Sequence, residues 1–242
     1  MRVRDVLHPG GSAIGLWCTL PSPLAAELLA RSGADYVVID QQHGAVAPAD
    51  LAAMTQAVHG AGRPALVRVG SHDPWVIGHA LDLGADGVIV PLVDSAAEAA
   101  AIVSACRYQP AGRRSWGRVR GEGDGEPLVL AMIETRAGLE AVGDIVATDG
   151  LDGVYIGPSD LSLGLGAHPT PTIEHAVVLE AIDVVRAAAD AAGVLCGVHC
   201  LSGEDAARFV GAGFAMVNAG ADSGLLRAAL AAALAAARGA TG

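Results

Sequence analysis

Short runs rich in β-branched residues alternate along this chain with longer stretches rich in alanine and leucine. Such alternation predicts parallel strands joined by crossover helices. Eight units of this kind can be counted, and their strands are expected at residues 14–20, 36–40, 65–69, 87–92, 128–134, 153–157, 194–200 and 215–219. Eight βα units in 242 residues are typical of a (β/α)₈ barrel, the TIM-barrel fold of the α/β class.

A weak internal repeat supports this count. Ser-Gly-Ala-Asp-Tyr-Val at 32–37 recurs as Leu-Gly-Ala-Asp-Gly-Val at 83–88, with related forms at 149–154 and 211–216. In each copy a glycine suits a helix C-terminus and a strand follows. No Pro- or Ser-rich linker divides the units, so residues 1–242 are expected to form one domain. An open doubly wound sheet is the structural alternative, but no Gly-x-Gly-x-x-Gly follows the first strand.

The chain contains no lysine, since all 15 basic residues are arginine. This excludes a Schiff-base aldolase, a pyridoxal-phosphate enzyme and a P-loop, because each needs a lysine nitrogen. The net charge of -11 and the lack of a basic run argue against nucleic acid or an anionic membrane as the main partner. Hydrophobic residues make up 52% of the chain, which suggests that partner subunits cover some apolar surface.

The cysteines and the apolar segments favour a reduced, cytoplasmic protein. Cys196 and Cys200 lie four residues apart on one expected strand, about 13 Å from each other at the usual rise per residue, which is too far for a disulfide. The N-terminal residues are charged and do not read as a signal peptide, and the longest apolar stretch, 228–237, is too short to span a bilayer.

Polar residues follow several of the expected strands at the end where barrel enzymes place their reactive groups. Asp40 and His43 lie at the end of the second strand, Arg68 at the end of the third, Glu134 at the end of the fifth and Asp160 just beyond the sixth. Glu134 and Asp160 offer hard oxygen ligands without an accompanying His or Cys. This set suits Mg²⁺ or Mn²⁺, with water and substrate completing the coordination.

These residue types are consistent with chemistry on a 2-oxo acid. A divalent metal would act as a Lewis acid where no lysine is present. Arg68 would bind the substrate carboxylate, and the backbone N–H groups of Ser159 and Asp160 at the start of a helix could share that anion. His43 titrates near neutral pH and is the candidate for moving a proton on or off the substrate hydroxyl.

Structural interpretations exist for the same residues. Glu134 could cap the helix that starts at Thr135, and Asp160 could cap the helix after Pro158. The segment 218–224 could cradle a phosphate or could simply cap a helix. His72, His79 and His199 are interpreted as histidines with local hydrogen bonds or surface positions. The last helix carries a stripe of leucines at Leu226, Leu230 and Leu234, which would dock on the barrel or on a neighbouring subunit.

A set of six motifs in register resembles one known family. The motifs are Val38-Ile39-Asp40-Gln41-Gln42-His43-Gly44, Val67-Arg68-Val69, Leu81-Asp82-Leu83-Gly84-Ala85, Tyr108-Gln109-Pro110-Ala111-Gly112, Ile133-Glu134-Thr135 and Ile156-Gly157-Pro158-Ser159-Asp160-Leu161-Ser162. Together they resemble the HpcH/HpaI family of class II, metal-dependent pyruvate aldolases. The resemblance implies a (β/α)₈ barrel with a swapped C-terminal helix, assembled as a homohexamer. It also implies reversible retro-aldol cleavage of a 4-hydroxy-2-oxo acid to pyruvate and an aldehyde.

The resemblance also implies a role for each matching residue. His43 would be the base, Arg68 the pyruvate-binding arginine, and Glu134 and Asp160 the ligands of Mg²⁺ or Mn²⁺, with Co²⁺ as a further candidate. Asp40 and Asp82 match residues that orient the histidine, the latter from a neighbouring subunit.

The chain departs from the family pattern at three places. Gln42 stands where many members have Glu, and Met132 stands where some have Gln. The family's Gly-x-Arg-Gly loop becomes Gly112-Arg113-Arg114-Ser115 within a shortened 112–127 segment. That loop is expected near the aldehyde, so the resemblance does not name the aldehyde, the preferred metal or the stereochemistry.

Two other functions compete with the aldolase hypothesis. A citrate-lyase-like enzyme acting on an acyl-CoA would need basic side chains for the CoA, which Arg113, Arg114, Arg118 and Arg120 could supply. A non-catalytic barrel that binds a small acid or serves as an oligomeric scaffold is the third hypothesis. The presence of His43, Arg68, Glu134 and Asp160 together disfavours it.

Overall fold

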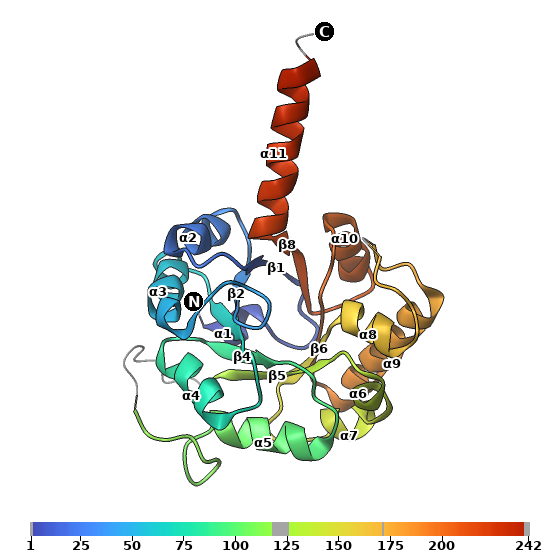
Figure 1. Ribbon diagram of the computed structural model, residues 1–242. Helices are drawn as coiled ribbons and strands as arrows, with labels where there is room; N and C mark the ends of the chain where they lie inside the picture. Colours follow the sequence, from blue (N-terminus) through green and yellow to red (C-terminus); the bar gives the residue numbers. More distant parts are fainter. Residues whose placement is uncertain (1, 118–125, 171, 240–242) are drawn as a thin grey trace.

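The computed structural model is a closed barrel of eight parallel strands, paired in sequence order (Figure 1). It describes residues 2–117, 126–170 and 172–239. The strands are β1 (Ala13–Cys18), β2 (Tyr36–Asp40), β3 (Ala65–Arg68), β4 (Gly87–Val90), β5 (Leu128–Ile133), β6 (Gly153–Ile156), β7 (Leu195–Val198) and β8 (Met216–Ala221). All eight expected strands are confirmed, and no end differs by more than two residues from its expected position.

Helices follow the strands and surround the barrel (Figure 1). They are α1 (Val3–Val6), α2 (Pro23–Arg31), the 3₁₀ helix η1 (Pro48–Asp50), α3 (Leu51–Gly60), α4 (Pro74–Asp82), α5 (Ala96–Cys106), α6 (Arg136–Glu140), α7 (Val142–Val146), α8 (Pro158–Gly164), α9 (Ala176–Ala192), α10 (Gly203–Gly211) and α11 (Asp222–Gly239). Several begin at a hydroxyl that accepts a backbone N–H of the first turn, as Ser22 does for α2 and Ser202 for α10. These local caps fix where the chain turns from loop to helix.

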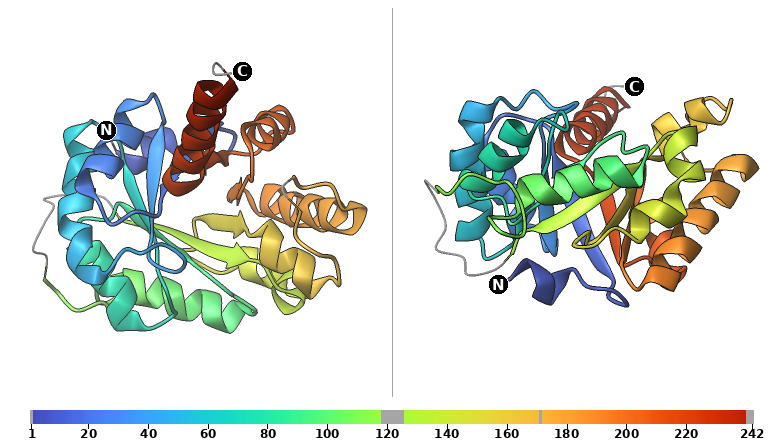
Figure 2. Two further views of the ribbon diagram at one scale, coloured as in Figure 1. Left: turned by 45° about the horizontal axis from the view of Figure 1, so that its top comes forward. Right: turned by 90° about the horizontal axis from the view of Figure 1, so that it is seen from below.

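The buried residues form two layers. One layer lies between the strands and the helices, and the other fills the barrel interior with large side chains that include Trp17, Tyr36 and Tyr155. Val3 and Leu7, in and just after α1, join the interior layer, so α1 covers the end at which the strands begin (Figure 2). The other end of the barrel, where the strands finish, is left for the polar residues.

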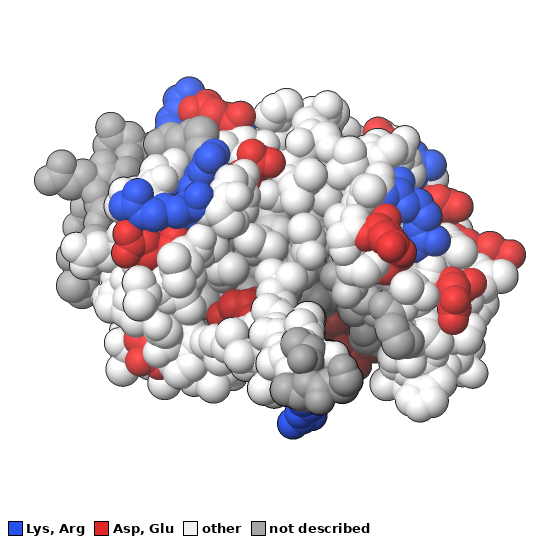
Figure 3. Space-filling model, turned by 90° about the horizontal axis from the view of Figure 1, so that it is seen from above, with Lys and Arg blue, Asp and Glu red and all other residues white. Residues whose placement is uncertain are grey.

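Helix α11 stands apart from the barrel. It projects outward from the end of β8, and its leucine stripe, Leu226, Leu230 and Leu234, is about half exposed (Figure 1). The stripe therefore does not dock on the barrel of its own chain. On the face seen in Figure 3, uncharged residues cover most of the surface, and acidic and basic side chains lie close together in small groups. No continuous basic patch is present on that face.

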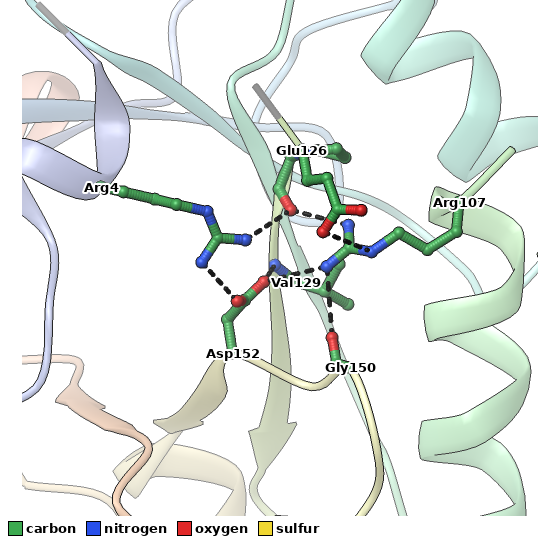
Figure 4. Close-up of polar contacts among 7 residues, drawn as sticks. Arg4, Arg107, Glu126, Val129, Gly150 and Asp152 are labelled. Carbon is green, nitrogen blue, oxygen red and sulfur yellow. Dashed lines mark hydrogen bonds and ion pairs between the residues drawn. The ribbon is translucent and has the colours of Figure 1, made fainter. Parts of the chain in front are cut away.

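A buried arginine joins the beginnings of several elements at the opposite end from the mouth (Figure 4). Arg107, just after α5, donates to the carbonyl of Pro127 at 2.8 Å and pairs with Asp152 at 3.3 Å. Asp152 also binds Arg4 at 2.6 Å and accepts the N–H of Val129 at 2.8 Å. Because Asp152 just precedes β6 and Val129 lies at the start of β5, this cluster is structural and is separate from the mouth.

All four cysteines are free and buried, as expected for Cys196 and Cys200. Burial raises the pKa of these two thiols to about 12. None of the helices that the structure describes combines the length and the apolar character needed to cross a bilayer.

Candidate active site

The alternation of side chains along each strand decides which residues face the mouth. On β2 the inward series is Tyr36, Val38 and Asp40, because Tyr36 and Val38 belong to the barrel interior and the side-chain period of a strand is two. The same rule turns Arg68 inward two residues after the interior Leu66, and Glu134 two residues after Met132. The polar mouth is therefore the last inward layer of a barrel that is otherwise filled with apolar side chains.

Asp40 and Arg68 form a buried pair on neighbouring strands. They are partners in the register of β2 and β3, and Arg68 donates from Nε to Oδ1 of Asp40 at 2.9 Å and from Nη2 to Oδ2 at 2.7 Å. The guanidinium also lies over the ring of Trp17, with its carbon 4.5 Å from the ring centroid. One edge of the planar guanidinium, formed by Nε and Nη2, is thus fixed, and Nη1 is left without a partner among the described residues.

The loop that follows β2 carries His43. Asp40 Oδ1 accepts the N–H of Gln42 at 3.0 Å and the N–H of His43 at 3.3 Å. Asp40 therefore holds His43 through its main chain, whereas the resemblance assigned it the orientation of the imidazole. His43 itself is exposed at the mouth.

Glu134 has one satisfied oxygen and one orphaned oxygen. It lies one residue after β5 and is 1% exposed, and its Oε1 accepts the N–H of Leu92 at 2.8 Å. Leu92 adopts a left-handed conformation with a φ of 54°, which is rare for a residue with a side chain and here accompanies the bond from its N–H to the carboxylate. Oε2 is buried and has no hydrogen-bond partner among the described residues.

The position of Gly157 depends on the same carboxylate. A Cβ atom at residue 157 would lie 2.5 Å from Glu134 Oε2 and 2.6 Å from the terminal carbon of Met132. Only glycine therefore leaves space for the orphaned oxygen at the end of β6.

The electrostatics of Glu134 are those of a carboxylate that lacks a counter-ion. Burial, with a smaller contribution from the nearby Asp160 carboxylate, raises its pKa to about 7 against the N–H of Leu92 and the guanidinium of Arg68, which lower it. Asp160 lies in the first turn of α8 and is partly exposed. Two acidic side chains thus converge on one place, where a cation would favour their ionised forms.

Neither Glu134 nor Asp160 caps a helix, which is the structural role that the sequence allowed for them. The helix after β5 is capped by Thr135, whose hydroxyl accepts the N–H of Gly138 at 2.9 Å. The helix after β6 begins at Gly157 and has no side-chain cap. The interpretation of Glu134 and Asp160 as capping residues is wrong, because a neighbouring hydroxyl or the bare backbone occupies each cap position.

This arrangement fits a divalent cation of the Mg²⁺ type. The donors are carboxylate oxygens, one of them orphaned and buried, and they suit a hard ion. Within the part of the chain that the structure describes, there is no group of three or more His, Cys, Asp or Glu side chains that could enclose a metal. The residues are therefore suited to an ion whose remaining ligands are water and substrate.

Asp82 lies elsewhere in the chain. It is the last residue of α4, and its carboxylate accepts a hydrogen bond from Arg114 at 2.5 Å. Arg114 is buried against the Tyr108 ring. Arg114 and Asp82 line a pocket of about 240 Å³ together with Trp75 and His79. Among the described residues Asp82 makes no hydrogen bond with His43 of the same chain, so the expected contact needs a second subunit.

The segment from Asn218 to Gly224 is a structural joint. The carboxylate of Asp222 accepts the N–H groups of Thr19 at 2.8 Å and Leu20 at 3.1 Å, and the hydroxyl of Thr19 at 2.6 Å. A carboxylate thus occupies the position at which a phosphate would need donors, and it ties the start of α11 to the loop after β1.

Sequence reasoning missed residues that complete the mouth. Trp17 packs against Arg68, and His199 lies edge-on to Trp17 with ring centroids 4.6 Å apart. The interpretation of His72 is confirmed, since its Nε2 contacts the carbonyl of Pro91 at 2.5 Å. The interpretation of His199 as a histidine with a local hydrogen bond or a surface position is wrong, because its ring turns into the barrel and its Nδ1 has no hydrogen-bond partner among the described residues. The period of two along β7 carries this signal, since Leu195 is interior.

The chain is similar to several known proteins. The chain is 42% identical over 238 residues to a hydroxypyruvate/pyruvate aldolase of Rhizorhabdus wittichii, covering 94% of this chain and 95% of that one. It is 40% identical to a 4-hydroxy-2-oxovalerate aldolase of Rhodococcus jostii, covering 92% and 90%. A crystal structure of an HpcH/HpaI aldolase/citrate lyase family protein from Burkholderia cenocepacia matches with a TM-score of 0.86, at 30% identity and 95% coverage of both chains.

The model of one protein family, described as HpcH/HpaI aldolase/citrate lyase, matches residues 13–229. This range contains every strand of the barrel and all the residues of the mouth. The chain therefore belongs to the HpcH/HpaI aldolase/citrate lyase family.

Proposed function

We propose that the chain is a divalent-metal-dependent aldolase that reversibly cleaves a 4-hydroxy-2-oxo acid into pyruvate, or a close 2-oxo acid, and an aldehyde. The observation that carries the proposal is one mouth that joins a forked, partly free arginine to a carboxylate with an orphaned oxygen. The relatives named as aldolases, which span nearly the whole chain, support it.

Arg68 is the group that would bind the substrate carboxylate. Asp40 already holds Nε and Nη2, so the guanidinium is fixed in orientation before substrate arrives and presents Nη1. A charge-assisted hydrogen bond from a buried, pre-oriented guanidinium is among the stronger contacts that a protein can offer a carboxylate. The N–H groups of Ser159 and Asp160, in the first turn of α8, would add donors to the same anion.

Glu134 and Asp160 would hold the metal, with Mg²⁺ or Mn²⁺ as the favoured ions and Co²⁺ as a further candidate. The orphaned Oε2 of Glu134 would gain its missing partner, and the mutual repulsion of the two carboxylates would be relieved. When bound, such an ion supplies the electron withdrawal from the keto group that a lysine supplies in Schiff-base aldolases.

His43 would move the proton. In the cleavage direction it accepts the proton of the 4-hydroxyl, the bond between carbons 3 and 4 breaks, and the aldehyde forms. The electron pair stays with the 2-oxo acid as its enolate, which then takes a proton at carbon 3. Asp40 would position His43 through the two N–H contacts, and Asp82 of a neighbouring subunit would orient the imidazole.

The structure gives less support to the acyl-CoA hypothesis. Of the four arginines that could bind CoA, Arg114 is buried in its pair with Asp82, and Arg118 and Arg120 lie outside the described residues. A non-catalytic barrel would have no need for a buried carboxylate with an orphaned oxygen, since such a group destabilises the fold.

We also propose that residues 1–242 act as one domain and that the chain assembles in the cytoplasm as a homohexamer with α11 swapped onto a neighbour. The half-exposed leucine stripe of α11 supports the exchange, because water contact of so much apolar surface is unfavourable. The free, buried cysteines are consistent with a reducing compartment.

The function can be tested by metal reconstitution. The protein is treated with a chelator, then supplied with Mg²⁺ or Mn²⁺ and a panel of 4-hydroxy-2-oxo acids, and pyruvate release is followed. We expect activity only with metal. Absence of turnover with every metal and every acid, in a protein that keeps its circular dichroism spectrum, would rule the proposal out.

Variants separate the roles within the site. Glu134→Ala and Asp160→Ala should lose both Mn²⁺ binding and cleavage. His43→Ala should lose cleavage but keep Mn²⁺ binding and the exchange of the methyl protons of pyruvate with deuterium, which NMR measures. Equal Mn²⁺ affinity in all three variants would contradict the assignment of the ligands.

A further inference from the structure

His199 is the inward residue just beyond the end of β7. The inward series of this strand is Leu195, Gly197 and His199, and a Cβ atom at residue 197 would lie 2.5 Å from the ring of Tyr155. Tyr155 therefore fills the barrel below the histidine, and His199 reaches the layer of Asp40, Arg68 and Glu134 without belonging to the set described above.

The backbone around His199 is fixed on both sides. Its N–H donates to the carbonyl of Ile156 on the neighbouring strand at 2.9 Å. The next residue, Cys200, binds the side chain of Asn218 through its N–H at 2.8 Å and through its carbonyl at 3.0 Å. Asn218 also accepts the hydroxyl of Tyr155 at 3.1 Å, so this hydroxyl is already engaged.

Within the described part of the chain, no hydrogen bond to the imidazole itself is present. Its Nδ1 is shielded from solvent and has no partner among the described residues, and its neighbours are the rings of Trp17 and Tyr155. A buried polar atom left unsatisfied destabilises the folded state, whereas leucine at this position would remove that cost. The fold by itself therefore gives no reason for a histidine, so a ligand contact is the simplest account of the unpaired ring.

The ring is a neutral hydrogen-bonding group. Burial, with a smaller contribution from the nearby Arg68 guanidinium, lowers the pKa of His199 to about 4 against the Asp40 carboxylate, which raises it. A neutral imidazole has one donor and one acceptor nitrogen, so it can bind a hydroxyl in either sense. It cannot act as a counter-ion for a carboxylate, which leaves that role to Arg68.

Trp17 connects this ring to the substrate anchor. One face of the indole is covered by Arg68, whose guanidinium carbon is 4.5 Å from the centroid, and His199 contacts the same indole edge-on. Arg68, the proposed anchor of the acid, and His199 therefore contact the same indole.

We propose that His199 is a specificity-determining residue, which hydrogen-bonds a substrate hydroxyl and thereby favours hydroxylated substrates over analogues that lack this group. The inference rests on the proposed aldolase function. The hydroxyl could belong to the 2-oxo acid, as in hydroxypyruvate, or to the aldehyde, as in a 2-hydroxyaldehyde. The two sources share one chemistry and are separated by the choice of substrates.

The experiment uses the metal-loaded enzyme in the condensation direction. Pyruvate and hydroxypyruvate are each combined with acetaldehyde and with glycolaldehyde, and kcat and KM are measured for all four pairs. The variants are His199→Leu, which removes the polar atoms at similar volume, and His199→Asn, which restores a polar side chain. His72→Leu is the matched control, because it makes the same change at a histidine in the loop after β3 that already has a carbonyl partner.

We expect His199→Leu to lower kcat/KM about five- to tenfold for pairs with the relevant hydroxyl, mainly through KM, and to leave the others nearly unchanged. His199→Asn should recover part of the preference, and His72→Leu should not alter it. The melting temperature of His199→Leu should equal or exceed that of the wild type. An effect confined to hydroxypyruvate assigns the hydroxyl to the acid, and one confined to glycolaldehyde assigns it to the aldehyde.

Equal losses on all four pairs, or no change on any, would overturn the role of His199 while the aldolase activity of the wild type still stood. Failure of the wild type to condense any pair with any metal would instead remove the proposed function, and the inference with it. The two failures are thus distinguishable in one set of measurements.

Discussion

Asp40 and Arg68 lie side by side on β2 and β3 and share two hydrogen bonds, of 2.9 and 2.7 Å, with side chains that are 2% and 8% exposed. Such a pair is expensive to desolvate, and replacing only one partner leaves an uncompensated charge. Its geometry uses one edge of the guanidinium, formed by Nε and Nη2, and leaves Nη1 for a ligand, so it orients Arg68 for binding as well as neutralising it.

Arg68→Lys tests whether the fork is needed. Lysine keeps the positive charge but cannot hold two oxygens of Asp40 and still present a fixed donor to substrate. We expect KM for the 2-oxo acid to rise at least about tenfold, which corresponds to roughly 1.4 kcal/mol. Steady-state kinetics with pyruvate as the varied substrate measure this. An unchanged KM would show that Arg68 does not bind the acid.

The pH dependence of stability should report the buried carboxylate of Glu134. Its folded pKa, about 7, lies above the ordinary value of 4.5, so the folded metal-free protein holds a proton in this window that the unfolded chain has lost. The free energy of unfolding should therefore gain a favourable contribution as pH falls from about 7 to 4.5, on the order of 3 kcal/mol. Urea unfolding at pH 5 and pH 8 with a chelator present measures it.

Glu134→Gln is the control for that contribution, because glutamine does not titrate. The free energy of unfolding should rise less between pH 8 and pH 5 in the variant than in the wild type. His199 and the other titrating groups remain in both proteins, so their effects cancel in the comparison. Identical pH profiles would mean that Glu134 has an ordinary pKa.

Gly157→Ala should damage the metal site without removing a ligand. The new methyl group would approach within 2.5 Å of Glu134 Oε2, so the carboxylate must move. The φ of Gly157 is -102°, which alanine adopts readily, so the backbone is not strained. We expect Mn²⁺ affinity, measured by isothermal titration, to fall about tenfold or more. Gly164→Ala, where the nearest atom would be 3.3 Å away, is the matched control.

The exposed face of α11 should control assembly. Replacing Leu226, Leu230 and Leu234 with Gln keeps helix propensity but removes the apolar stripe. We expect light scattering to show a smaller particle with an intact barrel by circular dichroism. Since α11 does not pack on its own barrel, the variant should lose little stability as a monomer. An unchanged particle mass would exclude the stripe as an interface.

The expected elements were recovered almost completely because their signals are local. Alternation of β-branched and helical segments located all eight strands, and their position at the carboxyl ends of those strands assigned Asp40, Arg68 and Glu134 to one end of the barrel. Where prediction erred, a long-range contact was responsible. The strand expected to reach Leu92 ends at Val90, since Leu92 turns into the left-handed region where its N–H meets Glu134.

What the amino-acid sequence determined by itself was the barrel, the absence of lysine chemistry and the placement of Asp40, Arg68 and Glu134 at one end of the barrel. The tertiary structure decided the burial, the partners and the pKa values of these residues. The pKa of Glu134, the fork of Arg68 on Asp40 and the pairing of Asp82 with Arg114 all depend on groups distant in sequence. His199 was set aside because a lone histidine carries no local signal; only closure of the barrel brings it against Trp17 and leaves it unpaired. Burial and partner geometry arise from packing, and no local pattern specifies them.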